Sequence, residues 1–239
     1  MIDLYPAIDL LGGRVVRLRQ GDYDDETVYD DDACAVARAF ADAGAPWVHV
    51  VDLDAARSGD PVNRPVVAAV VEALDGSAKL QTGGGVRSLT DARELAAAGV
   101  SRVVMGSAAV RDPDLVAAAS DVVAVAVGLD HRDGELAVHG WTEGSGQRLD
   151  QAYDRFPTAA AFVITDIARD GMLTGPDLDG LRASVAATSV PVIASGGVSS
   201  LEDVVALSTI DGLGGIITGK ALYEGRFTVG DAVSRLAEQ

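Results

Sequence analysis

A glycine-rich stretch that occurs twice most constrains how this chain can fold. Residues 82–91 read Thr-Gly-Gly-Gly-Val-Arg-Ser-Leu-Thr-Asp, and residues 194–203 read Ala-Ser-Gly-Gly-Val-Ser-Ser-Leu-Glu-Asp, at a constant offset of 112. In each copy an apolar run precedes the glycines and an amphipathic pattern follows them, which predicts a strand, a turn and a helix start. Such turns let backbone N–H groups approach an anion, and the helix N-terminus adds partial positive charge. The repeat therefore predicts two phosphate-binding turns, one in each half of the chain.

Eight short apolar segments alternate with helical patterns along the chain. The segments are rich in Val and Ile and apolar throughout, which is typical of strands covered on both faces. They span residues 2–8, 47–51, 78–81, 102–105, 122–127, 162–165, 190–194 and 215–218. The helical patterns span residues 31–43, 64–74, 89–98, 113–119, 149–156, 178–187, 201–207 and 229–236. Eight such units in 239 residues predict a single α/β domain over residues 1–239, a (β/α)8 TIM barrel.

The positions of the glycine turns favour the barrel over an open doubly wound sheet. The open fold carries its glycine fingerprint after the first strand, whereas here the turns follow the third and seventh strands. The repeat also extends further, since Gly106-Ser107 after the fourth strand parallels Gly219-Lys220 after the eighth. Asp9 and Asp130 end the first and fifth segments in the same way. The chain is therefore expected to consist of two duplicated half-barrels.

Composition excludes several classes of partner. The formal net charge of −17 argues against nucleic acid, because a phosphate backbone requires a basic face. No apolar run reaches the roughly 20 residues that span a bilayer, so no membrane association is expected. The N-terminus lacks the pattern of a signal peptide, and a single cysteine suits a reducing cytoplasm. A small phosphorylated ligand stays possible, since backbone N–H groups and a few arginines make a pocket locally positive.

Working residues of a barrel lie at the carboxyl ends of its strands. Asp9 and Asp130, on opposite sides of the predicted ring, suggest a general acid and a general base. Asp52 at the end of the second strand is expected either to bind substrate or to support a loop. His49 within that strand is expected either to contact substrate or to lie in the core. The three histidines lack metal-ligand spacing, so no metal site is expected.

Three polar loops are long enough to cover such a site. Residues 12–29 contain Arg19, and alternation over residues 15–19 suggests a small extra hairpin. Residues 133–148 contain Trp141 between glycines, which indicates a mobile stacking surface. The loop after the sixth strand contains Asp170, which can reach the site when that loop closes.

Together these motifs resemble one known family, the histidine-biosynthesis phosphoribosyl isomerases. The resemblance rests on residues 6–10, 13–18, 49–54, 84–87, 140–141, 165–171, 195–198 and 219–223, and it covers nearly the whole chain. It implies a half-barrel-duplicated enzyme that uses no cofactor and converts a phosphoribosyl-formimino aminoaldose to the aminoketose by an Amadori rearrangement. The implied substrate is a small molecule with a phosphate at each end, and we expect the enzyme to be a monomer.

The resemblance also assigns roles to individual residues. Asp9 is expected to remove the C2 proton, while Asp130 or Asp170 is expected to be the acid that helps to open the sugar ring, with Thr165 assisting. Arg19 and Trp141 are expected to hold the substrate from the two lids. The remaining predicted binding residues are His49, Asp52, Gly84, Gly85, Arg87, Gly106, Ser107, Gly196, Gly197, Gly219 and Lys220.

Three alternatives stay open at this point. The cyclase subunit of imidazole glycerol phosphate synthase shares the half-barrels, but Ala7 and Arg17 here differ from its usual residues. Bifunctional actinobacterial relatives also isomerise phosphoribosylanthranilate for tryptophan synthesis. They carry an arginine where this chain has His139, which predicts a weak or absent second activity. A non-catalytic phosphate-binding barrel would keep the glycines and lose one aspartate.

Overall fold

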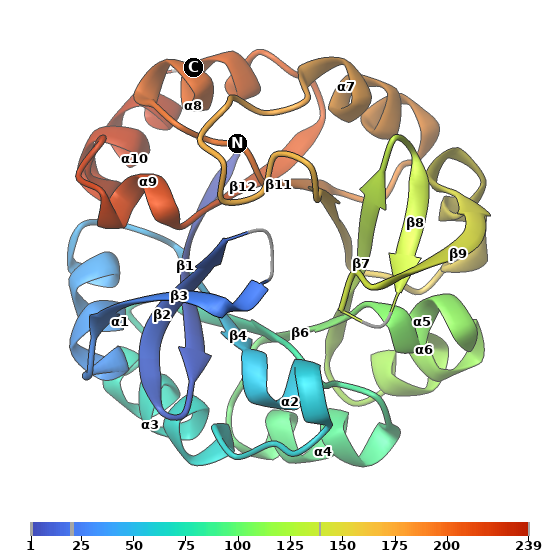
Figure 1. Cartoon of the computed structure of the whole chain (residues 1–239), viewed down its shortest axis with the longest axis horizontal. Helices are drawn as coiled ribbons and strands as arrows, with labels where there is room; N and C mark the ends of the chain where they lie inside the picture. Colours follow the sequence, from blue (N-terminus) through green and yellow to red (C-terminus); the bar gives the residue numbers. More distant parts are fainter. Residues whose placement is uncertain (1, 20–21, 139, 239) are drawn as a thin grey trace.

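An eight-stranded parallel barrel forms the centre of the computed structural model, which describes residues 2–19, 22–138 and 140–238 (Figure 1). Each strand pairs with the next along the ring, and the pairing of β7 with β10 and of β12 with β1 closes it. In ring order the strands are β1 (Asp3–Leu11), β4 (Trp47–Asp52), β5 (Lys79–Gly83), β6 (Arg102–Met105), β7 (Ala124–Arg132), β10 (Ala161–Asp166), β11 (Val192–Ser195) and β12 (Leu213–Thr218). The predicted barrel is therefore confirmed.

Helices surround the barrel on its outside (Figure 1). They are α1 (Ala33–Asp42), α2 (Leu53–Ser58), α3 (Arg64–Leu74), α4 (Leu89–Ala97), α5 (Ser107–Arg111), α6 (Pro113–Ser120), α7 (Leu178–Ala187), α8 (Leu201–Ser208), α9 (Lys220–Tyr223) and α10 (Val229–Ala237). Ser88 caps α4 and Ser200 caps α8, and each side chain accepts a hydrogen bond from the backbone N–H of the acidic residue three positions on, Asp91 or Asp203. None of the helices within the described ranges is long and apolar enough to cross a membrane.

The helix predicted over residues 149–156 is wrong in type. The structure has two 3₁₀ turns there, η1 (Leu149–Gln151) and η2 (Tyr153–Arg155). Residues three apart share one side of a 3₁₀ turn. Tyr153 and Phe156 accordingly both pack edge-on against Phe162, with ring centroids 5.2 and 6.3 Å from it. Both rings thus contact β10 from one side of the turn, a long-range contact that no local sequence pattern indicates.

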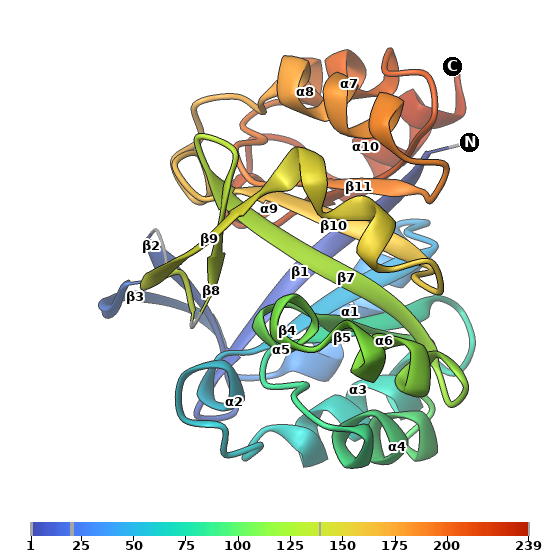
Figure 2. The same ribbon diagram turned by 90° about the vertical axis from the view of Figure 1, so that its right-hand side faces the viewer.

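Two hairpins extend the first and fifth barrel strands. Gly12-Gly13 joins β1 to β2 (Arg14–Arg19), and Asp133-Gly134 joins β7 to β8 (Glu135–Val138); β3 (Asp22–Asp30) and β9 (Glu143–Arg148) follow. All four turn residues have positive φ, as two-residue hairpin turns of type I′ require. Figure 2 shows both hairpins at one end of the barrel and both chain termini at the other.

These hairpins correct one prediction and confirm another. Asp9 and Asp130 do not end their strands, because each strand continues for two more residues into its hairpin, to Leu11 and Arg132. The extra hairpin suggested by residues 15–19 is confirmed. Each hairpin starts at the strand that carries one of the two aspartates, so the duplication extends to the lids.

Strand alternation decides which side chains enter the barrel. Successive side chains of a strand point to opposite faces, so Tyr5, Ala7 and Asp9 share the inner face of β1. The first two belong to an inner apolar cluster with Ala126, Val163 and other residues, separate from the core beneath the helices. By the same alternation, Ala126, Gly128 and Asp130 share the inner face of β7. Counted along the inner face, Asp9 therefore lies one residue above this apolar cluster and Asp130 lies two residues above it.

Candidate active site

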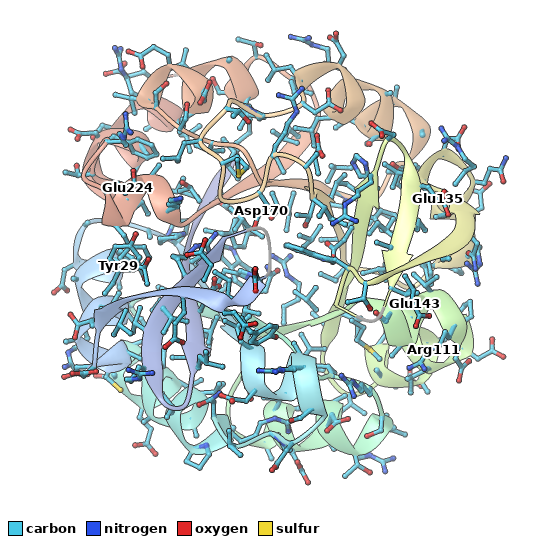
Figure 3. The ribbon with its side chains drawn as sticks, viewed as in Figure 1. Tyr29, Arg111, Glu135, Glu143, Asp170 and Glu224 are labelled. Carbon is cyan, nitrogen blue, oxygen red and sulfur yellow. The ribbon has the colours of Figure 1, made fainter. Side chains whose placement is uncertain are left out.

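A cavity of about 380 Å³ opens at the carboxyl end of the barrel. Figure 3 places Asp170 near the centre of this mouth, whereas Glu135 and Glu143 lie outward on the β8–β9 hairpin. Most of the residues predicted from the sequence line this one cavity. They are Asp9, His49, Gly84, Gly85, Arg87, Gly106, Ser107, Asp130, Trp141, Thr165, Asp170, Gly196, Gly197, Gly219 and Lys220.

Asp9 meets a cation in the cavity. Arg17 of β2 donates a hydrogen bond from Nη1 to Asp9 Oδ2 at 2.8 Å, and its Nη2 lies 3.9 Å from Asp170 Oδ1. Burial raises the pKa of Asp9, the Arg17 guanidinium opposes that rise, and the charge of Asp170 adds to it. Arg17 therefore supplies the countercharge that favours an ionised Asp9.

Asp130 has a different environment. The indole Nε1 of Trp141 donates to Asp130 Oδ2 at 2.7 Å, and the hydroxyl of Thr165 also hydrogen-bonds to this carboxyl. Burial raises the pKa of Asp130, these two hydrogen bonds oppose the rise, and the charge of Asp170 adds to it. Its direct partners are neutral donors, so Asp130 has less help than Asp9 in staying ionised.

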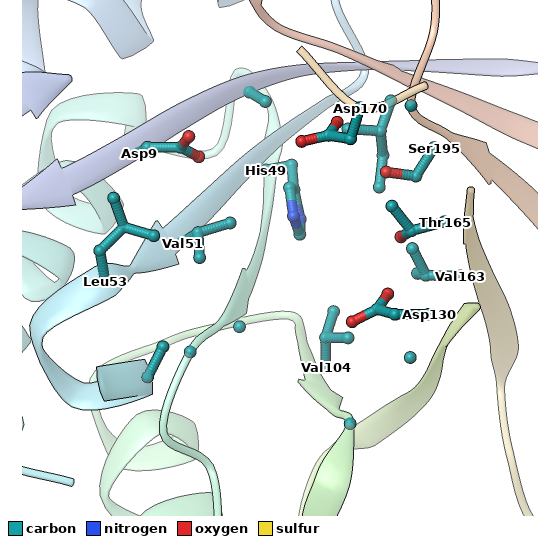
Figure 4. A pocket seen from close by; sticks show the side chains of 18 of the residues that line it. Asp9, His49, Val51, Leu53, Val104, Asp130, Val163, Thr165, Asp170 and Ser195 are labelled. Atoms are coloured by element: carbon teal, nitrogen blue, oxygen red, sulfur yellow. The ribbon is translucent and has the colours of Figure 1, made fainter. Parts of the chain in front are cut away.

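The two aspartates face the cavity from different sides, with the ring of His49 between them in the view of Figure 4. Gln81 Nε2 lies 2.9 Å from His49 Nδ1. Burial lowers the pKa of His49 to about 3, and the charges of Arg102 and Arg17 act in the same direction. The imidazole is therefore neutral at neutral pH.

The first glycine turn follows β5. Gly84 and Gly85 have φ of +87° and +70°. A Cβ on Gly84 would lie 2.1 Å from the carbonyl oxygen of Asp52, so only glycine fits against the end of β4. Arg87 lines the cavity here and donates to the carbonyl of Ala56 at 2.7 Å. Ser107 begins α5 on the neighbouring strand connection.

The second glycine turn follows β11, four strands away in the ring of eight, and so on the opposite side of the cavity. Gly196 and Gly197 have φ of +89° and +85°, and a Cβ on Gly197 would lie 2.4 Å from the carbonyl oxygen of Gly175. Lys220 begins α9 and donates from Nζ to the carbonyl of Gly171 at 2.9 Å. A cation beside this turn is thus tied to the loop that carries Asp170.

Two predicted ligands differ from the rest. Asp52 does not line the cavity; its Oδ1 caps α2 by accepting from Ala55 N at 3.0 Å and also accepts from Asn63 at 2.7 Å. The geometry gives it the loop-supporting role that the sequence left open. The side chain of Arg19 and all of His139 lie outside the described residues.

The structure brings Arg17 into contact with Asp9, whereas the sequence pointed to Arg17 only as a difference from the cyclase subunit and gave it no role in the site. A signal for it was present. The Gly12-Gly13 turn fixes the register in which Asp9 of β1 pairs with Val16 of β2. Arg17 follows Val16 on β2 and therefore lies close to the aspartate. Within the described ranges, no group of three or more His, Cys, Asp or Glu side chains has a geometry that could hold a metal ion.

Fold and site together define the class: a half-barrel-duplicated parallel (β/α)8 barrel with two glycine turns and two aspartates facing one cavity. The family described as histidine biosynthesis protein matches residues 3–228, and the chain belongs to this family.

Curated relatives are similar to this chain over nearly their full length. The chain is 46% identical to a protein of Rhizorhabdus wittichii over 97% of each chain, and 44% identical to one of Jannaschia sp. over 98% of this chain and 99% of that one. It is also 46% identical to a protein of Synechococcus sp. strain JA-2-3B'a(2-13), over 97% of this chain and 90% of that one. All three relatives are named 1-(5-phosphoribosyl)-5-((5-phosphoribosylamino)methylideneamino) imidazole-4-carboxamide isomerase.

Proposed function

We propose that this chain is the isomerase of histidine biosynthesis that converts a phosphoribosyl-formimino aminoaldose to the aminoketose. The observation that carries the proposal is the placement of two glycine turns on opposite sides of a cavity whose walls hold Asp9 and Asp130. A substrate with a phosphate at each end spans such a cavity and leaves its sugar between the aspartates. The relatives' names describe a molecule with two phosphoribosyl groups, which agrees with two anion sites.

Each phosphate site combines backbone N–H groups with cations. Gly84, Gly85 and the start of α5 hold one phosphate together with Arg87. Gly196, Gly197 and the start of α9 hold the other together with Lys220. Glycine at these positions lets the backbone approach the anion, and the helix starts add backbone N–H groups and partial positive charge. These few positive groups attract a dianion although the chain carries a net charge of −17.

The chemistry needs one acid and one base, and the surroundings of the two aspartates separate them. Asp130, with neutral donors as direct partners, keeps a proton, which it gives to the ring oxygen of the sugar as the C1–O bond breaks. Ring opening leaves a protonated imine at C1, and Asp9, ionised beside Arg17, removes the C2 proton from it to give a neutral enaminol. Return of a proton to C1 and loss of the C2 hydroxyl proton give the aminoketose, so no atom is gained or lost.

Thr165 and Trp141 hold the carboxyl of Asp130 in place through their hydrogen bonds. Asp170 is the competing candidate for the acid, because its loop lines the same cavity and its carboxylate lies 3.9 Å from Arg17. Comparing Asp130→Asn with Asp170→Asn separates the two, since the acid variant loses turnover while substrate still binds.

The test of the function is steady-state turnover of the aminoaldose by the purified protein, with conversion to the aminoketose followed by chromatography. Inorganic phosphate is expected to compete with the substrate. Phosphoribosylanthranilate is measured in parallel, and a much lower kcat/KM is expected for it. Absence of aminoaldose turnover under conditions in which a curated relative is active refutes the proposal.

A further inference from the structure

Behind His49 lies a chain of hydrogen bonds that runs from the cavity to the floor of the barrel. His49 Nδ1 contacts Gln81 Nε2 at 2.9 Å, and Gln81 Oε1 accepts from Arg102 Nε at 2.6 Å. Gln81 is fully buried, Arg102 is 8% exposed, and neither lines the cavity. They can act on a ligand only through the His49 ring.

Residues at the floor of the barrel fix the orientation of Arg102, and so they determine which atoms of the hydrogen-bond chain donate and which accept. Arg102 Nη2 donates to the hydroxyl of Tyr5 at 2.7 Å, and the guanidinium carbon lies 4.3 Å from the ring centroid of Trp47 and 5.4 Å from that of Tyr5. Trp47 in turn donates from Nε1 to Asp3 at 3.2 Å. The guanidinium thus lies against both aromatic rings, which stack on each other with centroids 5.4 Å apart, and its Nε is aimed at Gln81.

The donor groups of Arg102 at one end of the chain determine which ring nitrogen of His49 carries the proton at the other end. A guanidinium has donors and no acceptor, so the atom of Gln81 that faces Arg102 must be the carbonyl oxygen. The amide NH₂ group of Gln81 then faces His49, and it can only donate. His49 Nδ1 must therefore accept, and in a neutral imidazole the single proton lies on Nε2.

We propose that Gln81 and Arg102 are positioning residues that lock His49 in its Nε2–H tautomer, so that the ring offers the substrate a hydrogen-bond donor. The ring lies among the cavity-lining side chains between Asp9 and Asp130 (Figure 4). The recognised group is an acceptor oxygen of the sugar that the two phosphates hold in place. This inference rests on the proposed function for the identity of the sugar, but the tautomer itself does not.

The tautomer is read from ¹⁵N chemical shifts of histidine-labelled, ligand-free protein, because protonated and unprotonated ring nitrogens differ widely. The chain has three histidines, so loss of one signal set in His49→Gln assigns the ring. We expect Nε2 protonated and Nδ1 unprotonated, without titration down to about pH 5. A protonated Nδ1 in the wild-type protein overturns the proposal.

Gln81→Glu reverses the polarity of the chain. The carboxylate still accepts from Arg102, but its second oxygen now accepts from His49, which draws the ring proton to Nδ1 and raises the pKa of His49. We expect the ¹⁵N pattern to reverse and kcat/KM to fall by about tenfold or more, the effect of one lost substrate hydrogen bond. Reversal of the tautomer with unchanged kcat/KM refutes a role in recognition.

Thr82→Val is the matched control. Thr82 is the next residue on β5, is equally buried, and hydrogen-bonds to the carbonyl of Val50 rather than to the His49 chain. Its loss is expected to lower stability without changing the His49 spectrum or kcat/KM. If Thr82→Val reproduces the effects of Gln81→Glu, the effects are structural and the proposal fails. If the wild-type protein shows no turnover, the proposed function fails. The spectrum of the ligand-free protein tests the tautomer independently of that result.

Discussion

Replacing Asp9 by Asn tests the assignment of the base most directly. The change keeps the shape of the side chain and its place on the inner face of β1, and it removes the ionisable group that contacts Arg17 at 2.8 Å. The amide oxygen can still accept from Arg17. Arg17 also keeps Asp170 at 3.9 Å, so its buried charge retains a partner. The variant should therefore fold and bind both phosphates.

We expect Asp9→Asn to lower kcat strongly and to change substrate binding little. A positioned general base contributes about 10²- to 10⁴-fold, or roughly 2.7–5.5 kcal/mol of barrier, and an amide cannot accept a proton in its place. Because the proposed phosphate sites are at the turns rather than at Asp9, KM should change less than about threefold. The free energy of unfolding should change by about 1 kcal/mol, since loss of the ion pair and relief of the buried carboxylate oppose each other.

The assay compares Asp9→Asn with Asp52→Asn by steady-state kinetics and by urea unfolding. Asp52 is also a buried carboxylate near a strand end, but its hydrogen bonds go to Ala55 and Asn63 and it does not line the cavity. Asp52→Asn should keep its kcat and change stability by less than about 1 kcal/mol, since asparagine caps a helix about as well as aspartate. If Asp9→Asn keeps kcat within a factor of five while substrate binds, the acid–base assignment is wrong.

Three further predictions follow from single contacts. Trp141→Phe removes the hydrogen bond that lowers the pKa of Asp130; that pKa should rise, and the alkaline limb of the pH–rate profile should move to higher pH. An unmoved limb argues against Asp130 as the acid. Gly197→Ala places a Cβ 2.4 Å from a carbonyl oxygen, so urea unfolding should show a loss of at least about 2 kcal/mol. Gly140→Ala, also at positive φ but with open space, should lose about 1 kcal/mol and serves as its control. Ser88→Ala should cost about 1 kcal/mol in the same assay, and an unchanged midpoint contradicts the observed cap.

Local chemistry in the sequence determined the framework of this protein. Apolar runs of strand length, glycines that need positive φ, and serines three residues before an acidic residue each act within a few residues of chain. The eight strands, both glycine turns and the caps at Ser88 and Ser200 were therefore predictable. The duplication also indicated which positions correspond, and so brought Asp9 and Asp130 forward as a pair.

Tertiary structure decided what each charged group meets. Whether an aspartate in the last residues of a strand faces the cavity, as Asp9 does, or caps a helix, as Asp52 does, depends on strand alternation and on which donor lies nearby. Gln81 and Arg102 read in the sequence as ordinary strand residues, and only closure of the ring aligns them behind His49. Hydrogen bonds between residues far apart in the chain leave no periodic signal, because the fold alone sets their distances. Sequence thus located the two glycine turns and the two aspartates, and packing determined which groups they contact.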